Sequence, residues 1–276
     1  MQTLTRLIFV ILATVYLVAC SGPTEPDDQS FMYPLAVGNQ WVYEYTEIWA
    51  YSDSTPTDTA RFTITATVMS AQVILPGIVS YTIFESGKNQ YGDTLQGFKA
   101  YVNRPEGMYA YYRSNPGPQI ILPKRNPVRS ELKGIDERLG RLVQPSAFPL
   151  PASSQSEIEY YDPTPLVLPY PQRVGHQWAL LDSAANGGLG VDNRIAAWES
   201  ITVAAGTFDC VSIDWIMKPP IADVEYSYHI AAVGVVSRSI SLYDIEVADY
   251  SFPYGTGETA DIYMKYELIS YTLGTH

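Results

Sequence analysis

The sequence is poor in the side chains that most often catalyse reactions or bind metals. Only two cysteines and three histidines occur among its 276 residues. The histidines, His176, His229 and His276, share no metal-ligand spacing. The chain also lacks a G-x-S-x-G elbow, a phosphate-binding loop and a dinucleotide fingerprint. We therefore expect no catalytic residues, no metal and no cofactor, and interpret the chain as non-enzymatic, although a triad built on His229 stays open in principle.

Positive charge is also scarce. The chain has 17 Lys and Arg against 29 Asp and Glu, which gives a formal net charge of −12. Such an acidic chain is poorly suited to nucleic acid, whose phosphates require basic groups. It is equally unsuited to broad electrostatic docking onto anionic lipid headgroups. We expect no nucleic-acid partner, and we expect any membrane attachment to depend on something other than charge.

Long hydrophobic runs are limited to one segment near the start of the chain. Leu7–Ala19 is interrupted only by Thr14 and is too short for a comfortable membrane span, which needs about 20 apolar residues. With Arg6 before it, the run has the form of a secretory signal peptide, residues 1–19. It ends in Leu17-Val18-Ala19-Cys20, which resembles the bacterial lipobox. The resemblance implies cleavage before Cys20 and fatty acylation of its thiol; the alternative is an ordinary signal peptide that contains a cysteine.

Acyl chains on Cys20 would hold the protein at a membrane, because each buried CH₂ contributes about 0.8 kcal/mol. Ser21 is not the Asp that commonly retains lipoproteins at the inner membrane, so the resemblance implies the outer membrane in a host that has two. Residues 20–30 are polar and contain proline, and we expect them to form a flexible tether before a β domain over residues 31–276. Cys210 is then the single remaining thiol, and its alternating surroundings predict a buried position.

Helix-favouring stretches are few, whereas aromatic residues are common and tyrosine alone accounts for 22 residues. Aromatic and β-branched side chains suit pleated, half-buried strands. The 20 prolines and 19 glycines supply turns between them. Alternation and turn signals predict strands over residues 40–48, 60–70, 79–86, 97–103, 107–113, 177–182, 193–203, 209–217, 224–231, 235–242 and 261–272.

The fold class is therefore expected to be all-β and mainly antiparallel, as a large curved sheet, a half-barrel or a sandwich of two related halves. One short amphipathic helix is predicted near residues 130–143, where apolar residues recur at helical spacing. The proline-rich stretch Pro145–Pro171 is expected to cross as an irregular connection. Its Leu166-Val167-Leu168 indicates that it packs on the body of the domain.

The chain contains an internal repeat. Tyr33–Trp41 and Tyr170–Trp178 share the pattern YPxxVGxQW, which predicts a glycine-centred turn leading to a strand whose tryptophan enters the core. The chain is either an old duplication or one domain that uses the same strand start twice. We favour two related sheet halves, about 31–144 and 170–276, that share one core.

Three segments of the sequence resemble a known family of proteins. Pro34–Tyr43 (PLAVGNQWVY) is similar to the opening of a large, mostly uncharacterised group of bacterial envelope lipoproteins, whose pattern is PLxVGNxWxY. Val203–Cys210, with its AGTFDC turn, and Ala231–Val236 fit later parts of that pattern. These motifs are turns and strand starts and carry no known catalytic residues. The resemblance implies a curved antiparallel sheet, comparable by fold-level analogy with the half-barrels of lipoprotein-carrier proteins, which hold acyl chains in a concave face.

Two pairs of tyrosines are the candidate ligand surface. Residues two apart in a strand lie on one face, so Tyr109 with Tyr111, and Tyr226 with Tyr228, each form a row. An inward row would belong to the core or to a lipid-sized groove, whereas an outward row could stack on sugars. We expect a membrane-anchored lipoprotein that binds a hydrophobic or amphipathic ligand in a concave sheet. The alternatives are a cell-surface scaffold or glycan-contacting module and, third, an envelope hydrolase; the ligand and the oligomeric state stay open.

Overall fold

The structure is a computed structural model, and it describes residues 30–51, 57–89, 94–114, 128–129, 150–151, 158–160, 164–181, 190–218, 224–249 and 258–274. Contacts group Phe31–His276 into one compact unit. Every regular element in the described ranges is a strand: β1 (Gln40–Tyr51), β2 (Asp58–Leu75), β3 (Ile78–Asn89), β4 (Thr94–Arg104), β5 (Gly107–Ser114), β6 (Val128–Arg129), β7 (Leu150–Pro151), β8 (Ile158–Tyr160), β9 (Leu166–Pro169), β10 (Gln177–Leu181), β11 (Gly190–Val203), β12 (Gly206–Lys218), β13 (Val224–Ala231), β14 (Gly234–Asp249) and β15 (Glu258–Thr272).

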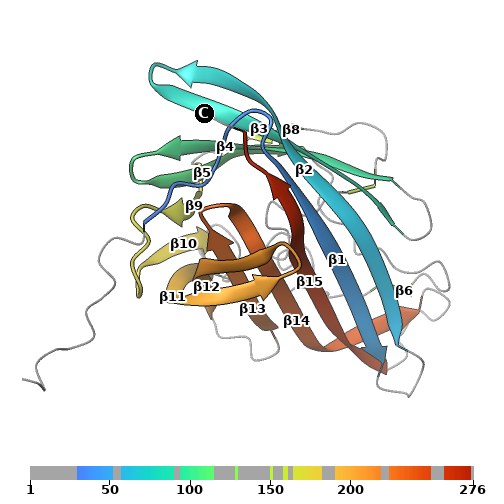
Figure 1. The fold of residues 1–276 in the computed structure, drawn as a ribbon. Coiled ribbons are helices and arrows are strands. Elements are labelled where there is room, and N and C mark those ends of the chain that lie inside the picture. The colour runs from blue at the N-terminus through green and yellow to red at the C-terminus, as the bar shows by residue number, and fades with distance from the viewer. Residues whose placement is uncertain are drawn as a thin grey trace, which may run out of the picture. The chain divides into compact units, whose positions relative to one another are not determined.

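The strands form one antiparallel sheet, and its order is β10-β11-β12-β13-β14-β15-β1-β2-β3-β4-β5-β8, with β6, β7 and β9 paired to β14, β4 and β5. Two meanders, β1–β5 and β10–β14, are therefore joined by β15, which pairs with both β14 and β1. The sheet curves strongly (Figure 1). Its two ends approach each other, because β9 contacts β10. The sheet is thus nearly closed, and the all-β, mainly antiparallel fold class is confirmed.

The predicted strands are present, and alternation explains them. In β1 every second side chain from Trp41 to Trp49 is buried, as expected for a sheet with one face on the core. The main differences are in length, since β2 runs on to Leu75 and β14 to Asp249. Both strands contain β-bulges, where an extra residue breaks the alternation of buried and exposed side chains. Beyond the bulges the sequence no longer shows a regular alternation, so the predicted strands end too early.

The proline-rich stretch differs from the irregular connection that was expected. It contains the short strands β7, β8 and β9, because each finds an open edge of β4 or β5 to pair with. Leu168 of β9 is fully buried, which confirms that this stretch packs on the body of the domain. The helix predicted near residues 130–143 lies outside the described residues.

The repeated motif forms the same turn in both places. Gly38 and Gly175 adopt φ values of 92° and 85°, which glycine reaches without a steric penalty. The Gly38 amide donates to the Val68 carbonyl at 2.9 Å, and the Gly175 amide donates to the Ile195 carbonyl at 2.8 Å. The amides of Val68 and Ile195 donate back to the residue after each glycine. The predicted glycine-centred turn is therefore confirmed in both copies.

The tryptophan that follows each turn enters the core, also as predicted. Trp41 is 1% exposed, and its indole Nε1 donates to the Val233 carbonyl at 2.5 Å, beside the β13–β14 hairpin. Trp178 is 8% exposed and donates to the Leu166 carbonyl at 3.0 Å. Leu166 belongs to β9, which pairs with β5. Each tryptophan thus forms a hydrogen bond across the domain. Trp41 of the first meander bonds to the β13–β14 hairpin, and Trp178 of the second meander bonds to β9, which pairs with β5 of the first.

One core follows the inner face of the sheet, and its buried members come from both meanders. Tyr43 of β1 and Tyr266 of β15 stack there with ring centroids 4.1 Å apart. Cys210 is fully buried as predicted, and desolvation raises the pKa of its thiol to about 12, so the thiol is inert. In the part of the chain that is described, no helix has the length and hydropathy needed to cross a membrane.

Candidate functional site

The four tyrosines singled out from the sequence lie on two opposite faces of the sheet. Tyr226 and Tyr228 pack against the core, whereas Met108 and Ala110 are the core members of β5. Because side chains alternate along a strand, Tyr109 and Tyr111 point to the outer face. Tyr226 and Tyr228 share the inner face, whereas a register shift in the β4–β5 ladder interrupts the pair Tyr109 and Tyr111, and the structure does not bring the two pairs together into one surface.

The inner row is part of a larger aromatic surface. Trp215 of β12 stacks on Tyr226 of β13 with ring centroids 3.8 Å apart and planes 11° apart. Tyr228 follows with its centroid 6.2 Å from that of Tyr226. All three residues are half-buried. We call Trp215, Tyr226 and Tyr228 the concave aromatic wall.

A buried cation lies against this wall. Arg238 of β14 is 2% exposed, and its guanidinium carbon is 5.3 Å from the ring centre of Tyr226 and 5.9 Å from that of Tyr228. This geometry is a cation–π arrangement, in which the aromatic faces offset part of the cost of burying the charge. Desolvation raises the pKa of both phenols, so their hydroxyl groups stay neutral. The wall therefore offers apolar faces, hydroxyl groups and a nearby positive charge.

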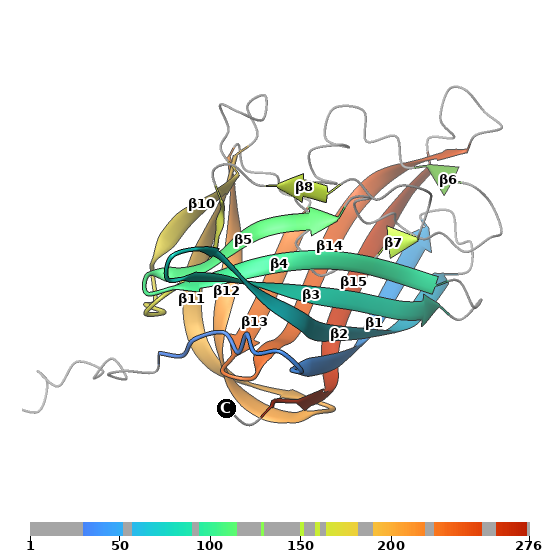
Figure 2. The same ribbon diagram turned by 90° about the horizontal axis from the view of Figure 1, so that it is seen from above.

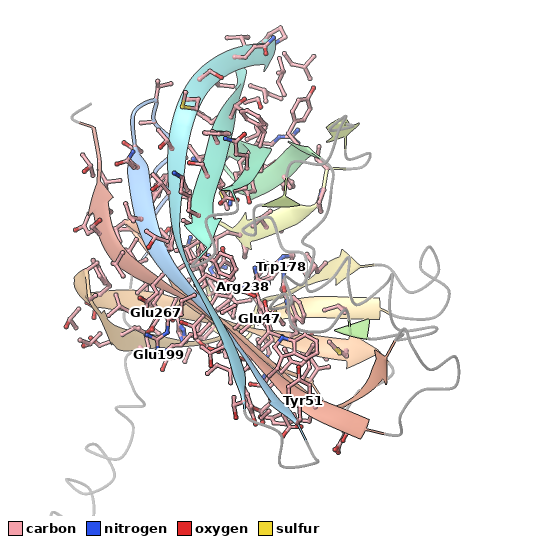
Figure 3. All side chains as sticks on the ribbon, turned by 90° about the vertical axis from the view of Figure 1, so that its right-hand side faces the viewer. Glu47, Tyr51, Trp178, Glu199, Arg238 and Glu267 are labelled. Carbon is pink, nitrogen blue, oxygen red and sulfur yellow. The ribbon has the colours of Figure 1, made fainter. Side chains whose placement is uncertain are left out.

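A buried carboxylate lies on the same face of the neighbouring meander. Glu47 of β1 accepts hydrogen bonds from the Tyr45 hydroxyl at 2.7 Å and from the Trp49 indole Nε1 at 2.6 Å. Burial raises the pKa of this carboxyl, while the two hydrogen bonds oppose that shift. Figure 3 shows Glu47 and Arg238 within the curve of the sheet, with the exposed Glu199 away from it.

A second buried carboxylate is paired with a lysine. Glu85 of β3 accepts a hydrogen bond from the ammonium group of Lys99 of β4, and both side chains are largely buried. Burial raises the pKa of Glu85 and lowers that of Lys99, and the attraction between the two opposes both shifts. Arg238 also favours the charged form of Glu85. The inner face therefore holds both signs of charge, which gives it polarity without a large net charge.

Sequence reasoning missed Glu47, Glu85, Lys99 and Arg238, although an available signal marks some of them. Glu47 is in phase with Trp41, Tyr43 and Trp49 in an alternating strand, so its inward direction follows from spacing alone. Arg238 is in phase with the buried Ile240 and Leu242 in the same way. A charged residue at an apolar position of a strand is thus a usable sign of a polar group in the core.

The outer tyrosines have a plainer environment. Tyr109 is half-buried, and the guanidinium of Arg104 lies 4.9 Å from its ring centre. A register shift in the β4–β5 ladder falls beside Tyr111, so the two tyrosines do not continue a regular row. This face therefore offers aromatic rings to solvent.

Of the two histidines in the described part of the chain, His229 has a hydroxyl group and a carboxylate as partners, which resembles a catalytic triad. Its Nδ1 is 2.9 Å from the Ser237 hydroxyl, and its Nε2 is 3.1 Å from a carboxylate oxygen of Glu199. Ser237, however, lies in the middle of β14, where it is paired with His229 on one side and with Glu267 on the other. An oxyanion is stabilised by hydrogen-bond donors beside the nucleophile, often backbone amides, and a strand paired on both sides uses its amides in the ladders.

The side chains of Ser237, His229 and Glu199 are therefore best explained as a hydrogen-bonded link between β14, β13 and β11. Within the described ranges, no group of three His, Cys, Asp or Glu side chains is placed to hold a metal ion. Cys20, the predicted lipidation site, lies outside the described residues, so its modification stays a prediction.

Neither the protein-family models nor the curated proteins include a match to this chain. Two solved structures are similar to it. A candidate lipoprotein from Parabacteroides distasonis is 13% identical, with 89% of this chain and 100% of that chain covered and a TM-score of 0.39. A candidate exported protein with a YmcC-like fold from Bacteroides fragilis is 12% identical, with 88% and 99% covered and a TM-score of 0.38. At these values the similarity brings no function to this chain, and its resemblance to the envelope lipoprotein group stays a prediction.

Proposed function

We propose that this protein is a non-enzymatic bacterial envelope lipoprotein, anchored by acyl chains on Cys20, that binds an amphipathic ligand at its concave aromatic wall. The lipobox-like Leu17–Cys20 and the polar tether over residues 20–30 support the anchor. Ser21 favours the outer membrane in a host with two membranes. The observation that carries the ligand proposal is the half-buried wall itself, with Arg238 behind it.

The chemistry of the wall favours a molecule with an apolar part and an acidic or polar head. The stacked faces of Trp215 and Tyr226 offer apolar area, and such faces are the usual lining of small-molecule sites. The neutral hydroxyl groups of Tyr226 and Tyr228 can donate hydrogen bonds to the head. Arg238 adds a positive potential at the same place, which an acidic head would complement.

A matched pair of variants tests this function, because the sequence supplies a tyrosine row on each face. The probe is anilinonaphthalene sulfonate, an anionic amphipath whose fluorescence rises in apolar sites. Tyr226→Ala should weaken its binding by removing the stacking partner of Trp215, whereas Tyr109→Ala on the outer face should leave binding unchanged. Equal affinity in the wild type and Tyr226→Ala would remove the proposal. Glycan binding lost with Tyr109→Ala alone would favour the glycan-contacting module instead.

The anchor has its own test. Cys20→Ser should abolish fatty-acyl labelling and release the protein from membranes, because the proposed attachment depends on acyl chains and not on charge. A Cys210→Ser variant is the control, since that thiol is buried and should leave membrane attachment unchanged. Continued membrane fractionation of Cys20→Ser would contradict the proposed anchor.

A further inference from the structure

Strands β2 and β3 continue beyond the sheet as a two-stranded ribbon. β1 pairs with β2 only as far as Thr67, and β4 pairs with β3 only from Ser80 onwards. Residues 68–79, which we call the ribbon, therefore rely almost entirely on the β2–β3 ladder. The ribbon ends in a turn at Gly77, which has a φ of 78°. Figures 1 and 2 show it projecting from one end of the sheet.

The ribbon carries no charge, and most of its residues beyond Val68 are exposed. Val73 is 68% exposed and Leu75 is 57% exposed, and Met69 at the base is exposed to a similar degree. From Phe62 to Phe84 the sequence has no charged side chain, which is the longest uncharged stretch of a chain with a net charge of −12. Exposed apolar surface that is concentrated in this way marks an interaction site more often than scattered single residues do.

The other meander shows that this exposure is not required by the fold. The β11–β12 hairpin extends in the same way, but its Cys210 packs with Ala231 and Val236 in a small cluster of its own. The Ala205 amide at its turn donates to the Leu268 carbonyl of β15 at 3.3 Å. The second hairpin is therefore covered by its own domain, whereas the ribbon leaves apolar side chains open to a partner.

Phe31, the first residue of the domain, lies at the end from which the ribbon projects. The Phe31 amide donates a hydrogen bond to the side-chain Oε1 of Gln172 at 3.2 Å. The ring of Phe31 packs edge-to-face on the ring of Trp198, with their centroids 5.9 Å apart. Met32 and Val174, beside this point, are also exposed apolar residues. In Figures 1 and 2 the first blue segment begins at the same end of the domain as the ribbon tip. Residues 20–31 can span at most about 40 Å, so a membrane that holds Cys20 lies within that distance of Phe31.

We propose that the ribbon inserts its apolar tip into the lipid bilayer that holds Cys20, an inference that rests on the proposed anchor. A bilayer suits a surface that has apolar side chains and no charges, because insertion then desolvates no ionised group. The outer edges of the ribbon carry peptide groups without ladder partners, and these require water. The tip therefore enters the interfacial region only, and it fixes the orientation of the domain on the membrane.

The test uses the lipidated full chain, reconstituted into vesicles of palmitoyl-oleoyl phosphatidylcholine that contain a nitroxide-labelled phosphatidylcholine. Val73→Cys carries a nitrobenzoxadiazole fluorophore at the ribbon. Ala204→Cys carries the same label at the turn of the β11–β12 hairpin and is the matched control. Labelling is selective because Cys210 is buried and Cys20 is acylated. The ribbon label should shift its emission to the blue and be quenched by the nitroxide lipid, whereas the control label should stay quenchable by aqueous iodide.

The outcomes separate this inference from the proposed function. If the protein floats with the vesicles but the ribbon label remains as accessible to iodide as the control label, the inference is overturned and the anchor stands. Energy transfer between labelled copies without quenching by lipid would also overturn it, because a second copy would then be the occupant. If the protein does not float with the vesicles, the anchor itself is overturned, and the inference falls with it.

Discussion

The two meanders, β1–β5 and β10–β14, begin alike and end differently. Both start with a glycine turn that is bonded in the same way to the second strand of its meander, and both send a tryptophan into the shared core. The first meander then places Glu47, Glu85 and Lys99 on the inner face, whereas the second places Arg238 and the concave aromatic wall there. One backbone plan thus supports two chemically different inner surfaces.

The hairpins differ as well. In the second meander the β11–β12 hairpin packs on its own domain through Cys210, whereas the ribbon of the first meander exposes Val73 and Leu75. The turn and the strand register therefore determine the framework, while a few side chains decide what each half can contact.

The largest expected effect is a difference in unfolding free energy when either of two ion pairs, one in each meander, is broken. Lys99→Met removes the cation beside Glu85 and leaves a buried carboxylate without its nearest partner, which should cost about 3–5 kcal/mol of unfolding free energy. Arg194→Met breaks a pair with Asp214 whose side chains are 43% and 36% exposed. Exposed pairs contribute at most about 1 kcal/mol. Urea denaturation of the two purified variants measures both costs.

The double variant Lys99→Met with Glu85→Gln is the control, because neutralising the buried carboxyl should restore part of the lost stability. Equal costs for Lys99→Met and Arg194→Met would show that the burial difference between the two pairs has no energetic consequence.

An intermediate and equal effect is expected at the two repeated turns. Gly38→Ala and Gly175→Ala each force a residue with a Cβ into a left-handed conformation, which costs about 1–2 kcal/mol. A Cβ at either position would meet nothing within 4 Å, so the cost comes from the backbone alone. Thermal denaturation should give the same loss for both variants. A loss at only one turn would break the equivalence of the two starts.

The smallest effect is expected to be a change in pH dependence. Burial raises the pKa of Glu47 above its ordinary value of 4.5, so the folded protein holds this proton more tightly than the unfolded chain does. The associated stability is present below pH 4.5 and is lost as the pH rises through the folded-state pKa. The wild type should therefore lose unfolding free energy between acidic and neutral pH, whereas Glu47→Gln has no carboxyl at this position to titrate. The unfolding free energy of Glu47→Gln minus that of the wild type should increase over this range, as measured by urea denaturation at several pH values.

Glu44→Gln is the matched control for this prediction, because Glu44 lies on the exposed face of the same strand. If both variants show the same pH dependence relative to the wild type, burial of Glu47 does not control the effect.

Much of the fold could be predicted because its strands alternate and its turns are punctuated by glycine and proline. The bounds of β13 were predicted as observed, and the burial of Cys210 followed from its alternating neighbours. The spacing of Tyr226 and Tyr228 as one row followed from the same rule, but its inward direction did not. Tyr109 and Tyr111 could not be assigned to a face, because periodicity gives the spacing of a row and not the side of the sheet to which it belongs.

The candidate site was harder to predict, because its parts come from strands far apart in the chain. Trp215 and Arg238 meet Tyr226 only through the pairing of β12, β13 and β14. The partners of His229 were missed for the same reason, since Glu199 and Ser237 lie on two other strands.

Consecutive residues are enough to predict the class of fold, the repeated glycine turns and the two tryptophans that enter the core. These features depend on local backbone preference and on side-chain spacing along one strand. Consecutive residues do not show which face each pair of tyrosines occupies, which charges meet in the interior or which hairpin stays uncovered. Those outcomes depend on strand order and sheet curvature, which are settled by contacts between residues far apart in the chain.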